Sequence, residues 1–111
     1  MMYQAYVHEL GVRLRPVAPI LAKKIMDGTA GEVPAYGYKI LVAGPDLSLQ
    51  ILAPYLLDAD VVMRERATVA LGYMGEAAAP AKQQVAAALA KAPTERERLL
   101  LAWCLRKIDA D

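Results

Sequence analysis

The chain has 111 residues, 57% of them hydrophobic, and its 13 lysines and arginines nearly balance 12 aspartates and glutamates, which leaves a net charge of +1. This length fits one compact domain over residues 1–111, and the balanced charge argues against a dedicated nucleic-acid binder, which usually carries a concentrated basic excess. No apolar run approaches the roughly 18 residues that span a bilayer. Cys104 is the only cysteine and cannot form a disulfide within the chain. The first residues lack the basic-then-apolar order of a secretory signal, so we expect a cytoplasmic protein.

The hydrophobic pattern predicts one helix after another and no β-strand, because apolar residues recur every three or four positions instead of alternating. Glycines close several of the predicted helices, and prolines lie in the first turn of others, where the missing N–H group costs no hydrogen bond. We expect seven helices, over residues 2–10, 15–26, 34–44, 45–57, 61–74, 78–90 and 94–108.

Four residues set the boundaries of the later helices. Pro54 lies inside the helix predicted over 45–57, where it removes a backbone hydrogen bond, so we expect a kink or a short break there. Asp60 is placed to cap the helix that begins at residue 61. Thr94 and Glu97 have the spacing of a capping box, in which Thr94 caps the last helix and the Glu97 side chain reaches back to it.

Four segments of nine residues carry similar sequences, at 3–11, 36–44, 67–75 and 101–109. They close at positions 11, 44, 75 and 109, so the spacings are 33, 31 and 34 residues. A period in this range is typical of a repeat array, in which each unit buries its apolar face only by stacking on its neighbours. Equivalent residues should therefore share one packing environment: Val7, Ile40, Leu71 and Leu105 at one large site, Leu10, Ala43, Met74 and Ile108 at a second, Ala5, Tyr38, Val69 and Trp103 at a third, and Ala70 and Cys104 at a small one.

A sequence motif stands in the middle of the chain. It comprises a proline and two leucines within residues 54–57, the aspartate turn 58–60, the pair Met63 and Arg64, and the closing sequence ALGYMG at 70–75. This motif resembles a HEAT-like repeat of the class found in phycobilisome lyases. The resemblance implies an α-solenoid, a right-handed stack of about three and a half antiparallel helical hairpins whose second helices form a concave face. Its units would span residues 2–27, 34–57 and 60–91, followed by a C-terminal capping helix over 94–109.

The resemblance also assigns a role to Arg64. In such repeats the equivalent arginine is expected to reach back to the turn carboxylate, here that of Asp58 or Asp60, and to fix the hairpin. We therefore expect a structural role for these three residues, with a ligand-binding role for Arg64 as the alternative.

Neither His8 nor Cys104 has the neighbours that catalysis needs. His8 is the single histidine, and the adjacent Glu9 points about 100° away around the helix, so it cannot orient the ring. Cys104 aligns with Ala70 at the small packed site, late in its helix, where the helix dipole does not favour a thiolate. No cysteine–histidine cluster and no glycine-rich phosphate loop is present. We expect no catalytic, cofactor-binding or metal site, and no enzyme.

Lysines and tyrosines are the candidates for contact with a partner. The lysines of the predicted second helices could line a mildly basic groove, although ordinary solvated lysines explain them as well. Tyrosine suits interfaces because it combines a large contact area with a polar tip. The candidate partner surface comprises Tyr3, Tyr6, Lys23, Lys24, Tyr55, Lys82 and Lys91.

These observations favour a non-catalytic module for protein–protein interaction or scaffolding, since a repeat array usually works by presenting a surface. The partner would be another protein or a second copy of the chain, because an uncovered first helix leaves apolar surface exposed. A nucleic-acid phosphate-binding repeat protein is the alternative. The family resemblance adds a second alternative, an accessory subunit in tetrapyrrole (bilin) attachment.

Overall fold

A computed structural model describes residues 13–29, 31, 33 and 35–109, and all regular secondary structure within them is helical, which confirms the predicted all-α class. The first predicted helix lies outside the described residues, together with Tyr3, Tyr6 and His8. The α-helices are α2 (Ala18–Asp27), α3 (Lys39–Ala43), α4 (Pro45–Leu52), α5 (Val61–Met74), α6 (Lys82–Lys91) and α7 (Glu95–Asp109). The 3₁₀ segments that extend them are η1 (Arg15–Val17), η2 (Ala35–Tyr38), η3 (Ala53–Leu57) and η4 (Gly75–Ala81).

Two prolines interrupt the helices that follow α3 and α5. α4 ends at Leu52, and Pro54 lies in the first turn of η3, so the break predicted at this proline is present. Pro80 lies inside η4, and α6 begins at Lys82 instead of residue 78. The ring of a proline clashes with the carbonyl four residues earlier in an α-helix, so regular α geometry begins only after Pro80.

The bounds of α5 are those predicted from the sequence. Asp60 Oδ1 accepts the N–H of Val62 at 2.8 Å, which satisfies one of the amides that a helix start leaves unpaired. At the other end Gly75 has a φ of +60°, a conformation that side chains with a Cβ atom rarely adopt. A capping aspartate and a closing glycine thus fix both ends of this helix.

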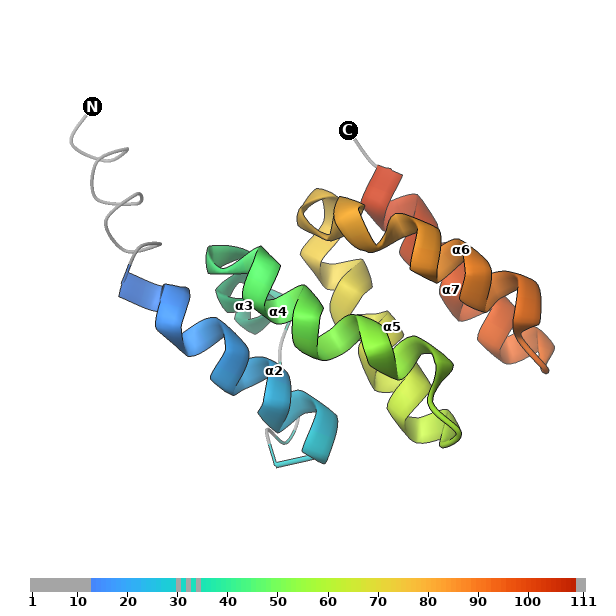
Figure 1. Ribbon diagram of the computed structural model, residues 1–111, viewed down its shortest axis with the longest axis horizontal. Coiled ribbons are helices and arrows are strands. Elements are labelled where there is room, and N and C mark those ends of the chain that lie inside the picture. Colours follow the sequence, from blue (N-terminus) through green and yellow to red (C-terminus); the bar gives the residue numbers. More distant parts are fainter. Residues whose placement is uncertain (1–12, 30, 32, 34, 110–111) are drawn as a thin grey trace.

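The helices follow one another from α2 at one side of the molecule to α7 at the other (Figure 1). α2 packs on α4, α5 packs on α7, and α7 also packs on α6 and η4. Their buried side chains form a single hydrophobic cluster. The largest apolar side chains that are completely enclosed are Leu41, Leu52, Leu71, Val85 and Cys104.

The burial of the repeated positions agrees only partly with the alignment of the four segments. Leu71 is fully buried, as are Ala70 and Cys104 at the small site. In the segment 36–44, however, Leu41 is fully buried and the predicted Ile40 only half-buried. The cause is a difference in neighbours, because α3 packs mainly on α2 whereas α5 packs mainly on α7.

Leu105 is also only half-buried, and Val7 lies outside the described residues. The second large site agrees better, with Met74 and Ile108 both buried. The repeat therefore fixes the position of each helix along the chain more reliably than the face that each helix buries.

Candidate functional site

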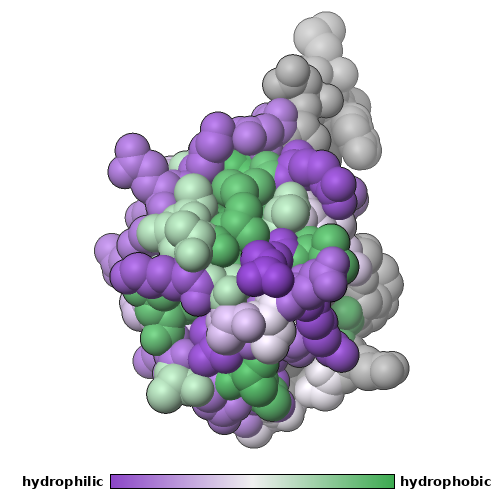
Figure 2. All heavy atoms as spheres, turned by 90° about the vertical axis from the view of Figure 1, so that its right-hand side faces the viewer, coloured by the Kyte–Doolittle hydropathy of each residue, from purple (hydrophilic) through white to green (hydrophobic). Residues whose placement is uncertain are grey.

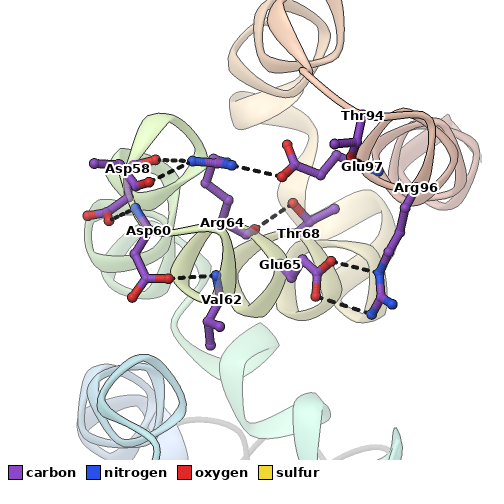
Figure 3. A network of polar contacts seen from close by, with 10 residues as sticks. Asp58, Asp60, Val62, Arg64, Glu65, Thr68, Thr94, Arg96 and Glu97 are labelled. Carbon is purple, nitrogen blue, oxygen red and sulfur yellow. Dashed lines mark hydrogen bonds and ion pairs between the residues drawn. The ribbon is translucent and has the colours of Figure 1, made fainter.

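A polar network surrounds the turn between η3 and α5 (Figure 3). Asp58 Oδ1 accepts the N–H of Asp60 at 2.8 Å, and Asp60 Oδ1 accepts the N–H of Val62 at the same distance. Both aspartates therefore use an oxygen to hold the backbone of the turn. This local pattern of side chain to backbone hydrogen bonds is the reason that aspartate is common in such turns.

Arg64 reaches back to this turn, but its acceptors differ from the prediction. Its Nη1 donates to the main-chain carbonyl of Asp58 at 2.7 Å and to that of Ala59 at 3.1 Å. The expected acceptor was a carboxylate of Asp58 or Asp60. Those carboxylates are already bonded to backbone N–H groups, which leaves the carbonyls of the turn to accept from the guanidinium.

The second terminal nitrogen of Arg64 joins α5 to α7. Nη2 donates to Glu97 Oε1 at 2.8 Å, and the Glu97 side chain is only 6% exposed. The hydrogen bond to Glu97 raises the pKa of Arg64 above its ordinary value, although partial burial opposes this. Arg64 thus connects the turn before α5 to the first turn of α7.

The pairing with Arg64 also alters the capping box predicted at the start of α7. The N–H of Glu97 donates to Thr94 Oγ1 at 3.2 Å, so Thr94 caps the helix as predicted. The Glu97 carboxylate does not complete the box, because it is directed to the guanidinium of Arg64. A charged guanidinium is a stronger partner for this carboxylate than a neutral backbone amide at the start of the helix.

A hollow of about 230 Å³ lies beside the network, between η3, α5, α6 and α7. We call it the Leu101 pocket. Arg64, Glu97 and Thr68 form part of its wall, and Thr68 Oγ1 donates to the carbonyl of Arg64 at 2.8 Å. The remaining walls are mainly apolar, formed by Leu56, Leu57, Ala88, Ala92, Pro93, Leu100 and Leu101, with Asp58, Glu65 and Lys91 beside them.

Three aromatic rings from different parts of the chain form a column of two contacts. The ring of Tyr38 lies 4.6 Å from that of Tyr73 at an interplanar angle of 20°, and Tyr73 meets Trp103 edge to face at 5.5 Å. Gly72 permits this contact, because a Cβ atom there would lie 2.2 Å from the Trp103 ring. This column was not predicted from the sequence, although the recurrence of a large aromatic residue at the aligned positions 38 and 103 is a signal for it.

The structure does not gather the predicted partner surface into one site. Lys23 and Lys24 are exposed on α2, whereas Tyr55 is half-buried against the core in η3. Lys82 and Lys91 stand at opposite ends of α6, about 14 Å apart along the helix axis.

The two lysines of α6 also differ in their surroundings. Lys82 Nζ lies 2.7 Å from Asp109 Oδ1, so its charge is compensated. Lys91 lines the Leu101 pocket and forms no ion pair with any other described residue. A continuous basic groove along the second helices is therefore not formed by these side chains.

The thiol of Cys104 is poorly suited to act as a nucleophile. Burial raises the pKa of the Cys104 thiol to about 12, which suppresses the thiolate that a nucleophile requires. No group of three histidine, cysteine or acidic residues within the described part of the chain is placed to hold a metal ion. Among the described residues, no helix has the length and apolar character required to cross a bilayer.

Comparison of the chain with family models, with curated proteins and with solved structures finds no match.

Proposed function

We propose that this chain is a non-catalytic helical-repeat module that binds another protein. Its helices would form a solenoid of antiparallel hairpins of the HEAT-like kind. Two packing relations support this arrangement: α2 lies against α4, and α5 lies against α7, so like helices of consecutive hairpins are in contact. The motif at residues 54–75 and the 31- to 34-residue period support it independently.

One observation carries the binding role: large apolar side chains remain exposed on either side of the aspartate turn, and one of them lines the Leu101 pocket. Leu57 is 60% exposed and also lines the pocket. Val61 and Val62, just beyond the aspartate turn, are 43% and 47% exposed. Val62 lines a separate hollow with Ile25 and Val69. The three exposed residues, which we call the patch at residues 57–62, thus expose apolar surface at two hollows that share Glu65, and exposed apolar surface marks protein interaction sites.

The size and lining of the pocket suit an apolar side chain of a protein partner. An engineered cavity of about 150 Å³ holds a benzene molecule, so a hollow of about 230 Å³ can accept one aromatic or branched side chain. Most charged groups of its wall are already satisfied, Glu97 by Arg64 and Glu65 by Arg96 at 2.9 Å. Contact at this site would then depend on apolar burial, with Leu57 at its edge.

Binding of nucleic-acid phosphates receives less support from the charges. Lys82 is compensated by Asp109, and Arg15 by Asp46 through two hydrogen bonds of 2.9 and 3.0 Å. A phosphate track needs several uncompensated cations in a row.

The test is capture of a partner from an extract of the native host, with three forms of the immobilised protein compared by quantitative mass spectrometry. The forms are the wild type, the double variant Leu57→Asp/Val62→Asp, and Ile20→Asp as control. Ile20 is 55% exposed on α2, away from the patch, so its substitution makes a comparable change elsewhere. We expect one protein to be enriched by the wild type and the control and to be lost with the double variant. The proposal would be wrong if all three forms enriched the same proteins, or none.

A further inference from the structure

The outer face of α7 carries a pattern of charges that complements itself. We define this face by Glu95, Leu99, Ala102 and Arg106, which fall within about 60° of one another around a helix of 3.6 residues per turn. The two charged residues stand at the ends of the stripe and the two apolar residues between them. Leu99 is 65% exposed, the highest value among the large hydrophobic residues described.

The charged ends of this face have no partners within the described part of the chain. Glu95 and Arg106 are both exposed, and neither takes part in an ion pair there. They lie eleven residues apart, or about 16.5 Å along the axis. The distance is too great for the two side chains of one helix to meet.

Comparison with α5 shows a difference on the face that a further helix would meet. In the aligned repeats Arg106 takes the position of Gly72, and the absence of a side chain at Gly72 is what lets Trp103 of α7 approach α5. An arginine at this position keeps a neighbouring helix at a greater distance. The outer face of α7 therefore suits a different kind of contact, one that gives Arg106 an acidic partner.

We propose that this face pairs with the same face of a second copy of the chain, with the two α7 helices antiparallel. A two-fold axis between residues 100 and 101 places Glu95 of each copy opposite Arg106 of the other. The same axis places Leu99 opposite Ala102, a large apolar residue against a small one. A symmetric pairing of one patch with itself is the commonest form of homodimer.

The antiparallel direction follows from the charges. A parallel pairing would set Glu95 against Glu95 and Arg106 against Arg106, which repel. The antiparallel pairing forms two opposite-charge pairs at the ends of an apolar centre. Figure 2 shows the molecule from the side of α6 and α7, where hydrophobic surface lies among hydrophilic side chains.

This contact uses no residue of the patch at residues 57–62, so it stands apart from the proposed binding of another protein. Substitutions on α7 should leave capture of that partner unchanged, and substitutions at Leu57 and Val62 should leave the pairing of α7 unchanged. Failure of either proposal can thus be recognised without reference to the other.

Sedimentation velocity over a concentration series tests the pairing. The wild type should show a reversible monomer–dimer equilibrium. Leu99→Asp should weaken dimerisation at least about tenfold, since one leucine is lost from each side of the axis. Glu95→Arg and Arg106→Glu should each weaken it at least about threefold, because both end pairs become repulsive.

Charge exchange makes the test specific for the antiparallel geometry. The double variant Glu95→Arg/Arg106→Glu restores both opposite-charge pairs and should dimerise like the wild type. A mixture of the two single variants should form a heterodimer, although each alone is repelled from itself. Lys107→Glu is the matched control for Arg106→Glu. Lys107 is exposed on the same turn of α7 as Arg106 but lies outside the stripe.

Circular dichroism of each variant shows whether the protein keeps its helix content. Only variants that remain folded are then compared by sedimentation. A wild type that stays monomeric at all concentrations would overturn the proposal. So would single charge reversals that sediment like the wild type, or a double variant that fails to recover dimerisation while it remains folded.

Discussion

Arg64 and Glu97 form an ion pair of 2.8 Å between α5 and α7, and the same guanidinium holds two carbonyls of the turn before α5. The Glu97 side chain is almost completely enclosed. One arginine therefore links the turn before α5 to α7, and loss of its acidic partner would leave the Nη2 atom without this acceptor.

We expect Glu97→Ala to lower the free energy of unfolding by about 1–3 kcal/mol, because the half-buried guanidinium of Arg64 loses its charged acceptor. Urea denaturation followed by circular dichroism measures this loss. Glu76→Ala is the matched control, since Glu76 is an exposed acid in the first turn of η4 and lies outside both proposed contacts. Equal effects of the two substitutions would show that the pair with Arg64 contributes nothing beyond the charge of an acid in a first helical turn.

Gly72→Ala should destabilise the protein, although alanine is ordinarily the better residue inside a helix by about 1 kcal/mol. The added methyl group would lie 2.2 Å from the ring of Trp103, so α7 must move away from α5. Overpacking of this kind costs about 1–3 kcal/mol.

A double-mutant cycle separates the steric cause from a general effect at Gly72. In the background Trp103→Leu the substitution Gly72→Ala should lose most of its cost, because the ring that it meets is gone. Thermal unfolding of the four proteins gives the coupling. Additive losses would show that contact between residues 72 and 103 is not the source of the destabilisation.

Burial of Cys104 makes the stability of the folded protein fall as the pH rises in the alkaline range. Its thiol has a pKa of about 12 in the folded protein, against an ordinary value of 9.0, because burial disfavours the thiolate. As the pH rises, the thiol of the unfolded chain therefore loses its proton at a lower pH than the thiol of the folded protein. The contribution of this group to stability is fully present below pH 9 and is lost as the pH rises from 9 towards 12. The slope is at most about 1.4 kcal/mol per pH unit.

Urea unfolding at pH 8 and at pH 10 measures this dependence, with Cys104→Ala as the reference that has no thiol. The wild type should lose more stability between the two pH values than the alanine variant does. At pH 8 the folded wild type should also react slowly with a thiol reagent and the unfolded chain rapidly. Fast labelling of the folded protein would contradict the burial of this residue.

The segment 36–44 allows a direct test of which face α3 buries. Leu41→Ala should cost about 2–5 kcal/mol, as expected for a large side chain that is completely enclosed. Ile40→Ala should cost clearly less, since Ile40 is only half-buried. The sequence alignment gives the opposite order, so chemical denaturation of the two variants discriminates between the alignment and the structure.

Much of the fold can be predicted from local signals in the sequence. Asp60 and Gly75 fix both ends of α5, and Pro54 breaks the helix that contains it, because capping, left-handed closure and the missing proline amide act within a few residues. These effects need no knowledge of the neighbouring helices. They could therefore be assigned before any packing was known.

The rest depends on contacts between segments distant in the sequence. Which of Ile40 and Leu41 is buried is decided by α2, and the acceptor of Arg64 is decided by the position of Glu97, 33 residues away. The candidate site shows the same limit, since Lys91 is near the Leu101 pocket while Lys82 is paired with Asp109. Periodicity places such residues on helices but does not say which other helix lies beside them.

The column of Tyr38, Tyr73 and Trp103 equips the protein with an intrinsic optical probe. Trp103 is the only tryptophan of the chain, and its ring rests on the bare backbone at Gly72 with a tyrosine at its edge. Its emission wavelength will thus register any opening of the seam between α5 and α7, even while both helices stay wound and the far-ultraviolet spectrum is unchanged.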